Sequence, residues 1–518
     1  VDEPTVAPVS VQSHNAQSAG MADRWLGWPG ALTGTGIWVI LNLVWIQVYR
    51  GDRLWDHEEV TYISRASIVG SRSVVFSGWR LLFHGYTPPM QSVLLAPVQL
   101  LTGVNEAWVI WLNILLTAVS ALVVYWIGRR MATPAAGAVS AALLLCTSGM
   151  QENARGALTM VPATTFTILA VAVLVAGRGF QSRNWSLAFG VAVGCMVLSR
   201  PMAIAFVPGL VLAGLLWSRA TPDRGRVFRH LVLGCAAAIG ASAWWWLVTF
   251  RELWAYLTTG LPWAETDDRL HILIDRFREL ALYLNPFSPL VAKSDRFVLV
   301  SVGALALPLV LYASLWLYRR FVGSPGPTEQ MGGVATELPV YPLWVVAGTG
   351  VVVSLVSNMI GWLILPVVPV IVVAAAVGVR RTLGDIAWNV WAMASVVPAI
   401  LASLFFSTVS TTPGNRYTWC MPRLQITNAC VGETAEDAAA WEAGLRDLSD
   451  ATRSVYKANG IEDGEPVVAV ASRDHLFVPQ AFSLQTWVDH GWVINTGNYF
   501  SSALTRREQI DEVRRQAE

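Results

Sequence analysis

The sequence has little charge for its length. Only 14% of its 518 residues are charged, while 54% are hydrophobic; soluble domains carry roughly 25% charged residues. This shortage disfavours a soluble protein and indicates one that is embedded in a membrane. The net charge of +1 also provides no basic excess of the kind that recruits nucleic acid.

Lysine and cysteine are scarce as well. Lys293 and Lys457 are the only lysines, a bias typical of a GC-rich bacterial genome. The five cysteines show no Cys-x-x-Cys spacing, which excludes the commonest thiolate metal motif. Cys420 and Cys430 are close enough in sequence to form a disulfide in an oxidising exterior, or to stay reduced. The start lacks a basic region followed by a cleavable apolar run, so we predict a disordered cytoplasmic tail at 1–28.

Long apolar runs, by contrast, are abundant. A membrane-spanning helix needs about 20 apolar residues. Eleven segments meet or nearly meet this length, at about 31–49, 107–128, 133–150, 158–177, 185–199, 200–218, 230–250, 298–318, 341–358, 360–379 and 386–408. We therefore predict a mostly α, polytopic membrane domain at 29–408. Three consecutive tryptophans, Trp244 to Trp246, are typical of an interfacial aromatic belt.

Basic residues in short loops mark the cytoplasmic side of a membrane protein. Here they follow every even-numbered apolar segment: Arg129, Arg130, Arg178, Arg183, Arg219, Arg224, Arg226, Arg229, Arg319, Arg320, Arg380 and Arg381. The N-terminus is then cytoplasmic. The long loops at 51–106 and 251–297 lie on the outer side, as does the tail after residue 408. The chain is expected in the bacterial plasma membrane.

The tail at 409–518 is predicted to be a small extracytoplasmic α/β domain. Apolar residues at three-to-four spacing, such as Trp441, Leu445 and Leu448, indicate a helix from Thr434 to about Asn459 that stops at Gly460. The stretch "PVVAVAS" at 466–472 is typical of a buried strand, and a polar helix ends the chain.

The first outer loop carries a cluster of acids. Directly after the first apolar segment, the stretch "RLWDHEEVTYIS" contains Asp56, Glu58 and Glu59. A carboxylate placed there can take a proton from a hydroxyl nucleophile. In a helix, Asp56 and Glu59 share one face while Glu58 shares another with Tyr62, so either Asp56 or Glu58 could be the base. The alternative is a solvated helix terminus, where acids are also favoured.

The second outer loop supplies the opposite charge through Arg269, His271 and Arg276. Arginine suits the geometry of phosphate oxygens. A base in one outer loop and cations in the other are suited to moving a group from a lipid phosphate. Part of this charge is equally compatible with a solvated surface.

Five stretches resemble the GT-C superfamily of membrane glycosyltransferases, in particular its bacterial protein-mannosyltransferase and aminoarabinose-transferase branch. The resemblance covers 51–220 fairly well and 340–380 loosely. The stretches are "EEVTYISRAS", "GYTPPMQSVLLAPV" with Tyr86, Pro88 and Pro89, "NARGALTMVPATTFTIL" with Arg155, "VLSRPMAIAFVPGLVL" with Arg200, and "GWLILPVVPVIVVAAAVG" with Pro366 and Pro369. Two places depart from the family pattern: Glu58 stands where aspartate is usual, and Gly361-Trp362 where arginine-tyrosine is expected.

The resemblance implies an inverting glycosyltransferase that uses a polyprenyl-phosphate sugar on the outer face, with an acid of the first outer loop as base and no metal or other cofactor. The acceptor would be a glycan, lipid or protein hydroxyl, in contact with membrane lipids. The sugar stays open, since mannose and arabinofuranose both fit. The residues predicted to bind substrate are Tyr62, His84, Tyr86, Arg155, Arg200, Arg269, His271 and Arg276.

Two other classes compete with an enzyme. Transporters and lipid flippases tend to show internal repeats and ionisable residues at mid-membrane; the sequence shows no repeat, and its spans have almost no charges at mid-depth. A membrane anchor for the C-terminal domain would not need eleven spans. A transporter or flippase of lipid-linked sugars is therefore the main alternative.

Overall fold

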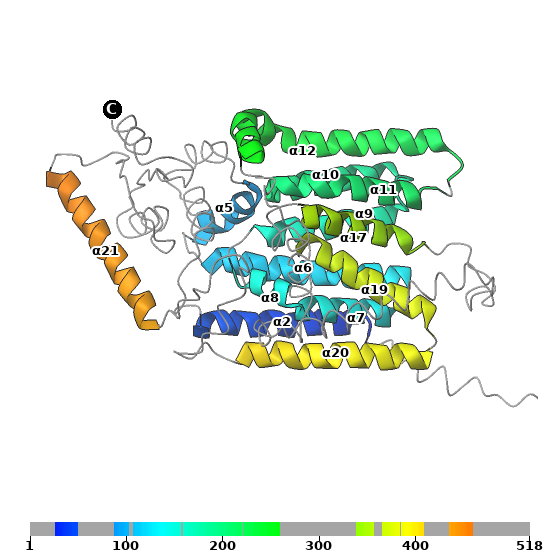
Figure 1. Cartoon of the computed structure of the whole chain (residues 1–518), viewed down its shortest axis with the longest axis horizontal. Helices are drawn as coiled ribbons and strands as arrows, with labels where there is room; N and C mark the ends of the chain where they lie inside the picture. Colours follow the sequence, from blue (N-terminus) through cyan, green and yellow to red (C-terminus); the bar gives the residue numbers. More distant parts are fainter. Residues whose placement is uncertain are drawn as a thin grey trace, which may run out of the picture.

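The computed structural model of the chain describes residues 26–49, 88–102, 107–156, 159–219, 221–259, 338–356, 365–383, 385–408 and 435–458. Within these ranges every regular element is a helix, and most of the helices run side by side as a bundle (Figure 1). Predictions that fall on other residues, among them the strand at 466–472 and the final polar helix, lie outside the described ranges.

The helices follow the apolar segments of the sequence. They are α2 (Trp28–Tyr49), α5 (Met90–Thr102), α6 (Ala107–Met131), α7 (Pro134–Cys146), α8 (Ser148–Ala154), α9 (Met160–Gly177), α10 (Arg183–Ser199), η2 (Pro201–Phe206), α11 (Val207–Trp217), α12 (Arg224–Thr259), α17 (Tyr341–Val356), η3 (Leu365–Val367), α19 (Val368–Thr382), α20 (Asp385–Thr408) and α21 (Ala435–Ala458). Ten of the eleven predicted segments overlap these helices; the eighth, 298–318, lies outside the described residues.

The membrane class is supported by length and composition. Five helical stretches are long and apolar enough to cross a membrane: Trp28–Gln47, Trp108–Met131, Met160–Gly177, Arg224–Phe250 and Leu365–Thr382. Four shorter apolar helices accompany them: Pro134–Cys146, Pro201–Trp217, Tyr341–Val352 and Asp385–Leu401. The total of eleven spans remains a prediction.

Two predicted boundaries were wrong. The segment 133–150 is not one helix, because Thr147 is extended and donates both its N–H and its hydroxyl to Leu144 O, which ends α7 at Cys146. At about 1.5 Å per residue, α7 is about 20 Å long, well short of a hydrocarbon core of about 30 Å. At the other boundary, α12 continues to Thr259, so residues 251–259 of the predicted second outer loop are helical.

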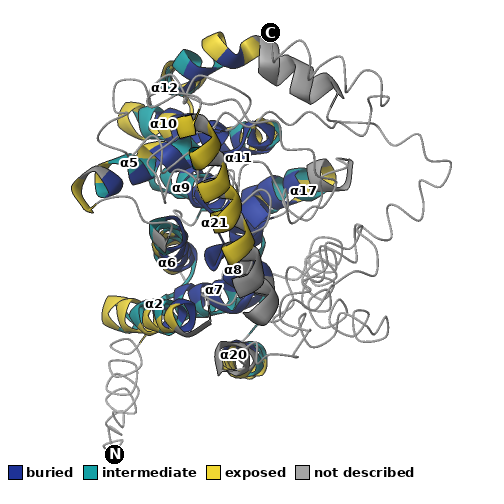
Figure 2. Cartoon of the chain, turned by 90° about the vertical axis from the view of Figure 1, so that its left-hand side faces the viewer, coloured by how far each residue is buried: buried dark blue, intermediate teal, exposed yellow. Residues whose placement is uncertain are grey.

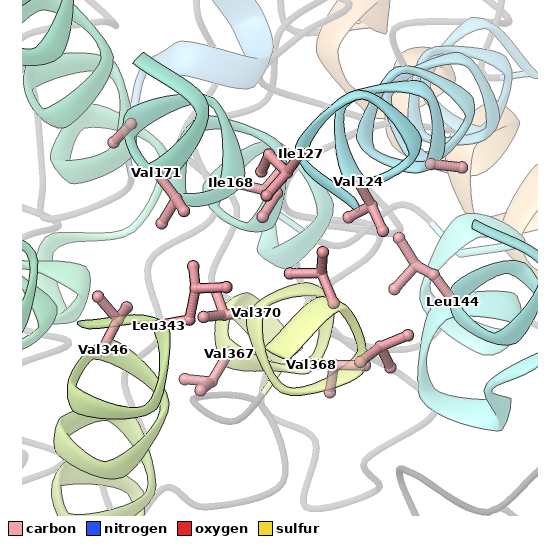
Figure 3. Packing of buried hydrophobic residues seen from close by; sticks show 14 of the residues in the cluster. Val124, Ile127, Leu144, Ile168, Val171, Leu343, Val346, Val367, Val368 and Val370 are labelled. Carbon is pink, nitrogen blue, oxygen red and sulfur yellow. The ribbon is translucent and has the colours of Figure 1, made fainter. Parts of the chain in front are cut away.

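The centre of the bundle is apolar. Side chains of α6, α7, α9, α17, η3 and α19 meet there (Figure 3), namely Val124, Ile127, Leu144, Ile168, Val171, Leu343, Val346, Val367, Val368 and Val370. Because lipid tails are as apolar as these side chains, the contacts stabilise the fold through close packing rather than through transfer out of water.

Small residues bring α10 and α12 into close contact. A Cβ at Gly190 would lie 2.1 Å from the carbonyl oxygen of Gly234, and one at Gly194 would lie 2.7 Å from the Cβ of Ala241. This is the small-residue packing by which membrane helices approach each other. On its other side α12 exposes Phe228, Ile239 and other large apolar side chains, as a lipid-facing helix would.

Hydrogen bonds join several helix ends at one end of the bundle, which we call the basic end. The Arg381 guanidinium donates to the carbonyl of Met131, the last residue of α6, and to the carbonyl of Leu338, three residues before α17. The Trp217 indole donates to Pro339 O at 3.0 Å. Phe180 O lies 3.0 Å from His230 Nδ1, which joins the α9–α10 turn to α12.

The described arginines that the sequence assigns to cytoplasmic loops gather at this basic end, on residues 129–130, 178–183, 219–229 and 380–381; Arg319 and Arg320 lie outside the described ranges. Their grouping agrees with the predicted alternation, although the side of the membrane is itself a prediction. The opposite end, which we call the site end, carries α5 (Figure 1). Helix α21 lies beyond the site end and exposes most of its described side chains (Figure 2); it confirms the helix predicted at 434–459.

Candidate functional site

Most of the predicted site residues lie outside the described ranges, and their roles stay predictions. These are Asp56, Glu58, Glu59, Tyr62, His84, Tyr86, Arg269, His271 and Arg276. The structure does describe the helices before and after the acidic part of the first outer loop: α2 ends at Tyr49, and α5, which lies within the predicted loop, begins at Met90 after the Pro88-Pro89 pair. It also describes the two remaining predicted residues, Arg155 and Arg200.

Arg155 lies in the turn between α8 and α9 and is 8% exposed. Its Nε donates to Oδ1 of Asn42 on α2 at 2.7 Å. Its guanidinium carbon lies 4.4 Å from the ring centroid of Trp45, one turn further along α2, in a cation–π arrangement. The Asn42 amide nitrogen donates to Trp38 O at 2.8 Å, which leaves the amide oxygen directed at Arg155.

The charge of Arg155 is enclosed by protein. Burial lowers the pKa of its guanidinium to about 9, so the side chain is still protonated at neutral pH. A buried cation is costly unless hydrogen bonds and negative charge compensate it. This position is therefore suited to hold an anionic group, from either the chain or a ligand.

Gly156, the next residue of the same turn, is held from the side opposite α2. Asn113 on α6 donates through Nδ2 to the carbonyl of Gly156 at 2.8 Å. Its Oδ1 accepts from Nε2 of Gln91 on α5 at 3.5 Å, the longest of these links. The Arg155–Gly156 turn is thus connected to α2 on one side and, through α6, to α5 on the other.

Helix α5 faces the bundle with its polar side. Gln91, Ser92, Leu95 and Gln99 are buried, while the opposite face exposes Val93, Pro97 and Leu101. Neither polar atom of the Gln99 side-chain amide has a hydrogen-bond partner within the described part of the chain. A helix that is polar inside and apolar outside suits a lipid-facing position at the edge of a polar interior. The eight-residue spacing of Gln91 and Gln99, about two helical turns, was the available sequence signal for this polar face.

Arg200 occupies the junction of α10 and η2, where its backbone is extended (φ −152°) and its N–H donates to Met196 O. It is 8% exposed, whereas a side chain that snorkels to lipid head groups would reach the surface. The residue two positions earlier, Leu198, packs with Trp245 and with Met90 at the start of α5.

This packing corrects the interpretation of the tryptophan triplet. Trp245 is completely buried against Leu198, and Trp244 and Trp246 are partly buried beside it. An interfacial belt needs rings that reach lipid head groups, so the prediction is wrong for Trp245. The periodicity of a helix explains the error, because three consecutive residues point in three directions.

The structure therefore brings the two described arginines to the same end of the bundle, on either side of the start of α5. Met90 contacts the segment that leads to Arg200, and Gln91 contacts the side chain that holds the Arg155 turn. Guanidinium groups in such buried positions can bind phosphate oxygens strongly. In the part of the chain that is described, no three His, Cys, Asp or Glu side chains gather as metal ligands.

Residues 86–246 match the family model described as dolichyl-phosphate-mannose-protein mannosyltransferase. The fold resembles that of ArnT from Cupriavidus metallidurans in a crystal structure bound to undecaprenyl phosphate, with a TM-score of 0.54 and 16% identity over 94% of this chain and 88% of that one. The apo crystal structure of ArnT gives a TM-score of 0.52 and 17% identity over 93% of this chain and 89% of that one.

An oligosaccharyltransferase of Archaeoglobus fulgidus tethered with an acceptor peptide gives a TM-score of 0.47 at 12% identity, over 89% of this chain and 64% of that one, which is too low to support a conclusion. No curated protein sequence matches the chain. The family match and the shared fold confirm the resemblance predicted from the sequence, which is to the GT-C superfamily of membrane glycosyltransferases.

Proposed function

We propose that the protein is an inverting glycosyltransferase that moves a sugar from a polyprenyl phosphate to an acceptor hydroxyl at the outer face of the bacterial plasma membrane. The observation that carries the proposal is the fold, which this chain shares over most of its length with an ArnT structure bound to undecaprenyl phosphate. The two buried arginines at the site end support it, because such a donor carries a phosphate.

The reaction follows from the predicted loop residues. Asp56 or Glu58 takes the proton of the acceptor hydroxyl, whose oxygen attacks the anomeric carbon on the face opposite the phosphate. The bond between this carbon and the phosphate oxygen breaks, and its electron pair leaves with polyprenyl phosphate. The products are a glycosylated acceptor with inverted configuration and a protonated carboxylate. No metal or other cofactor takes part in this scheme.

The cations stabilise the leaving group. Arg200 at the site end, with Arg269, His271 and Arg276 of the second outer loop, hydrogen bonds the phosphate as its negative charge increases. Arg155 adds a positive charge at the same end. We assign Tyr62, His84 and Tyr86 to the walls of the substrate site, and Glu59 to the catalytic acid cluster with Asp56 and Glu58. The acceptor is a glycan, lipid or protein, and mannose and arabinofuranose are the sugars to test first.

The test is transfer by the purified protein in detergent or nanodiscs, with radiolabelled polyprenyl-phosphate mannose or arabinofuranose and cell-envelope acceptors. The proposal predicts a labelled covalent product and release of polyprenyl phosphate. Proteoliposomes distinguish the transporter alternative: label that crosses the bilayer still attached to its lipid, with no covalent product, would refute a transferase.

A further inference from the structure

The acidic part of the first outer loop, residues 50–87, lies between α2 and α5 in the sequence, and we call it the acidic loop. These two helices are linked by side chains far apart in the sequence. From α2 the link passes through Asn42 to Arg155, and from Gly156 it passes through Asn113 to Gln91 on α5. We propose that Asn42 and Asn113 are positioning residues, which hold the α8–α9 turn against α2 and α5 and so fix the separation of the two ends of the acidic loop. This inference rests on the proposed function of that loop.

The hydrogen bond of Asn42 to Arg155 holds α2 about two turns before its C-terminal end. Asn42 lies seven residues before Tyr49, which corresponds to about 10 Å along a helix. The bond to Arg155 is charge-assisted and short, at 2.7 Å. Because the Asn42 amide nitrogen is occupied by Trp38 O, its oxygen has one orientation available, and the direction of α2 relative to the turn is set.

The Asn113 amide holds the second side with both of its polar atoms. The nitrogen donates to Gly156 O and the oxygen accepts from Gln91. Gln91 follows the Pro88-Pro89 pair by two residues, and proline rings restrict the backbone just before α5. A shift of Gln91 would therefore also shift the residues just before α5, where the acidic loop ends.

Burial makes these bonds specific. Asn42 is 1% exposed, Asn113 is 0% exposed, and Gln91 is buried beside them. Water cannot replace a lost partner in such surroundings, so each bond constrains geometry more than it would at a surface. Hydrogen bonds between membrane helices add directional contacts to the close packing that holds the helices together.

The consequence for the reaction is geometric. A base must lie within hydrogen-bond reach of the hydroxyl that it deprotonates, and a displacement of about 1 Å can lower the rate about 100-fold. Loss of either asparagine bond should therefore lower kcat for sugar transfer, about 10- to 100-fold, with a smaller change, under about threefold, in the KM for the lipid donor. A residue that only stabilised the fold would not separate these two constants.

Spin labels test the geometry without any need for activity. They are attached at the exposed positions Gln47→Cys on α2 and Leu101→Cys on α5, in a chain whose five native cysteines are replaced by alanine. We expect one narrow distance distribution in this background. Asn42→Ala or Asn113→Ala should broaden or shift it.

Two further variants serve as controls. Asn42→Asp keeps the acceptor for Arg155 but loses the donor to Trp38 O, so its distance distribution and its kcat should recover in part, to values between those of Asn42→Ala and the parent. Asn153→Ala removes another buried amide, whose nitrogen donates to Gly149 O of its own helix, and should leave both readouts unchanged. Size-exclusion profiles show which variants fold; if Asn113→Ala does not, the Asn42 pair decides.

Unchanged distances and unchanged kcat in Asn42→Ala would overturn the inference. So would a failure of Asn42→Asp to rescue, or a loss in Asn153→Ala as large as in Asn42→Ala. A parent protein that transfers no sugar would refute the proposed function instead, and the distance distributions would still decide whether the asparagines set the loop ends.

Discussion

The two ends of the bundle use arginine in opposite ways. At the basic end, Arg129, Arg130 and Arg178 are exposed at helix termini, where the sequence predicts that their charge orients the chain in the membrane. At the site end, Arg155 and Arg200 are each 8% exposed and lie among buried polar side chains. We therefore propose two roles for the same residue type: setting topology at one end and binding a phosphate at the other.

Variants of the acidic loop should give the largest loss of sugar transfer, and so the clearest evidence that the two ends differ in role. The double variant Asp56→Asn with Glu58→Gln removes both candidate bases and should lower transfer about 100- to 10,000-fold. The single variants identify which carboxylate acts, since only one of them should reproduce most of the loss. Normal turnover in the double variant would contradict the mechanism.

The arginines themselves give the next largest effect. Arg200→Ala removes a cation proposed to bind the leaving phosphate and should lower kcat roughly 100-fold. Arg129→Ala at the basic end removes an exposed cation of the same type and should leave kcat unchanged. Comparable losses in the two variants would mean that the ends do not differ in chemical role.

A packing variant should lower the stability of the whole bundle and does not distinguish its two ends. Gly190→Leu places a side chain where the Gly234 carbonyl already lies 2.1 Å from a Cβ, so α10 and α12 must separate. We expect a loss of about 1–3 kcal/mol, seen as a lower melting temperature in detergent. The control is Gly240→Ala, because no atom of the described residues outside its own helix lies within 4 Å of a Cβ there, and its melting temperature should not fall.

The smallest expected effect concerns the basic end alone. Thr133 caps α7 by accepting a hydrogen bond from the N–H of Ala136 at 3.2 Å. Thr133→Ala should cost about 1 kcal/mol, while Thr133→Ser keeps the hydroxyl and should be close to neutral. Thermal unfolding measures both, and kcat should stay at the parent value in each.

Much of the bundle could be predicted from the sequence because a bilayer demands long apolar helices and a basic cytoplasmic side. Those signals are compositional, so they survive without knowledge of any contact. They do not resolve a local break such as Thr147, where the carbonyl of Leu144 accepts from the hydroxyl and the N–H and ends α7 early. The predicted span at 133–150 was too long for that reason.

The candidate site was predictable only in its types of residue. The arginines at 155 and 200 stood out because charges are rare in this chain. Asn42 and Asn113 did not, since single amides in apolar helices carry no periodic signal and their partners lie 22 to 113 residues away. The roles of Asp56, Glu58 and the second-loop cations stay predictions, as does the α/β class of the tail.

A structure of the full chain with polyprenyl phosphate bound tests the central claim most directly. The account predicts that the phosphate lies at the site end, beside the start of α5, with its oxygens within hydrogen-bond distance of the Arg200 guanidinium. A phosphate bound among the exposed arginines of the basic end, with none at the site end, would contradict it.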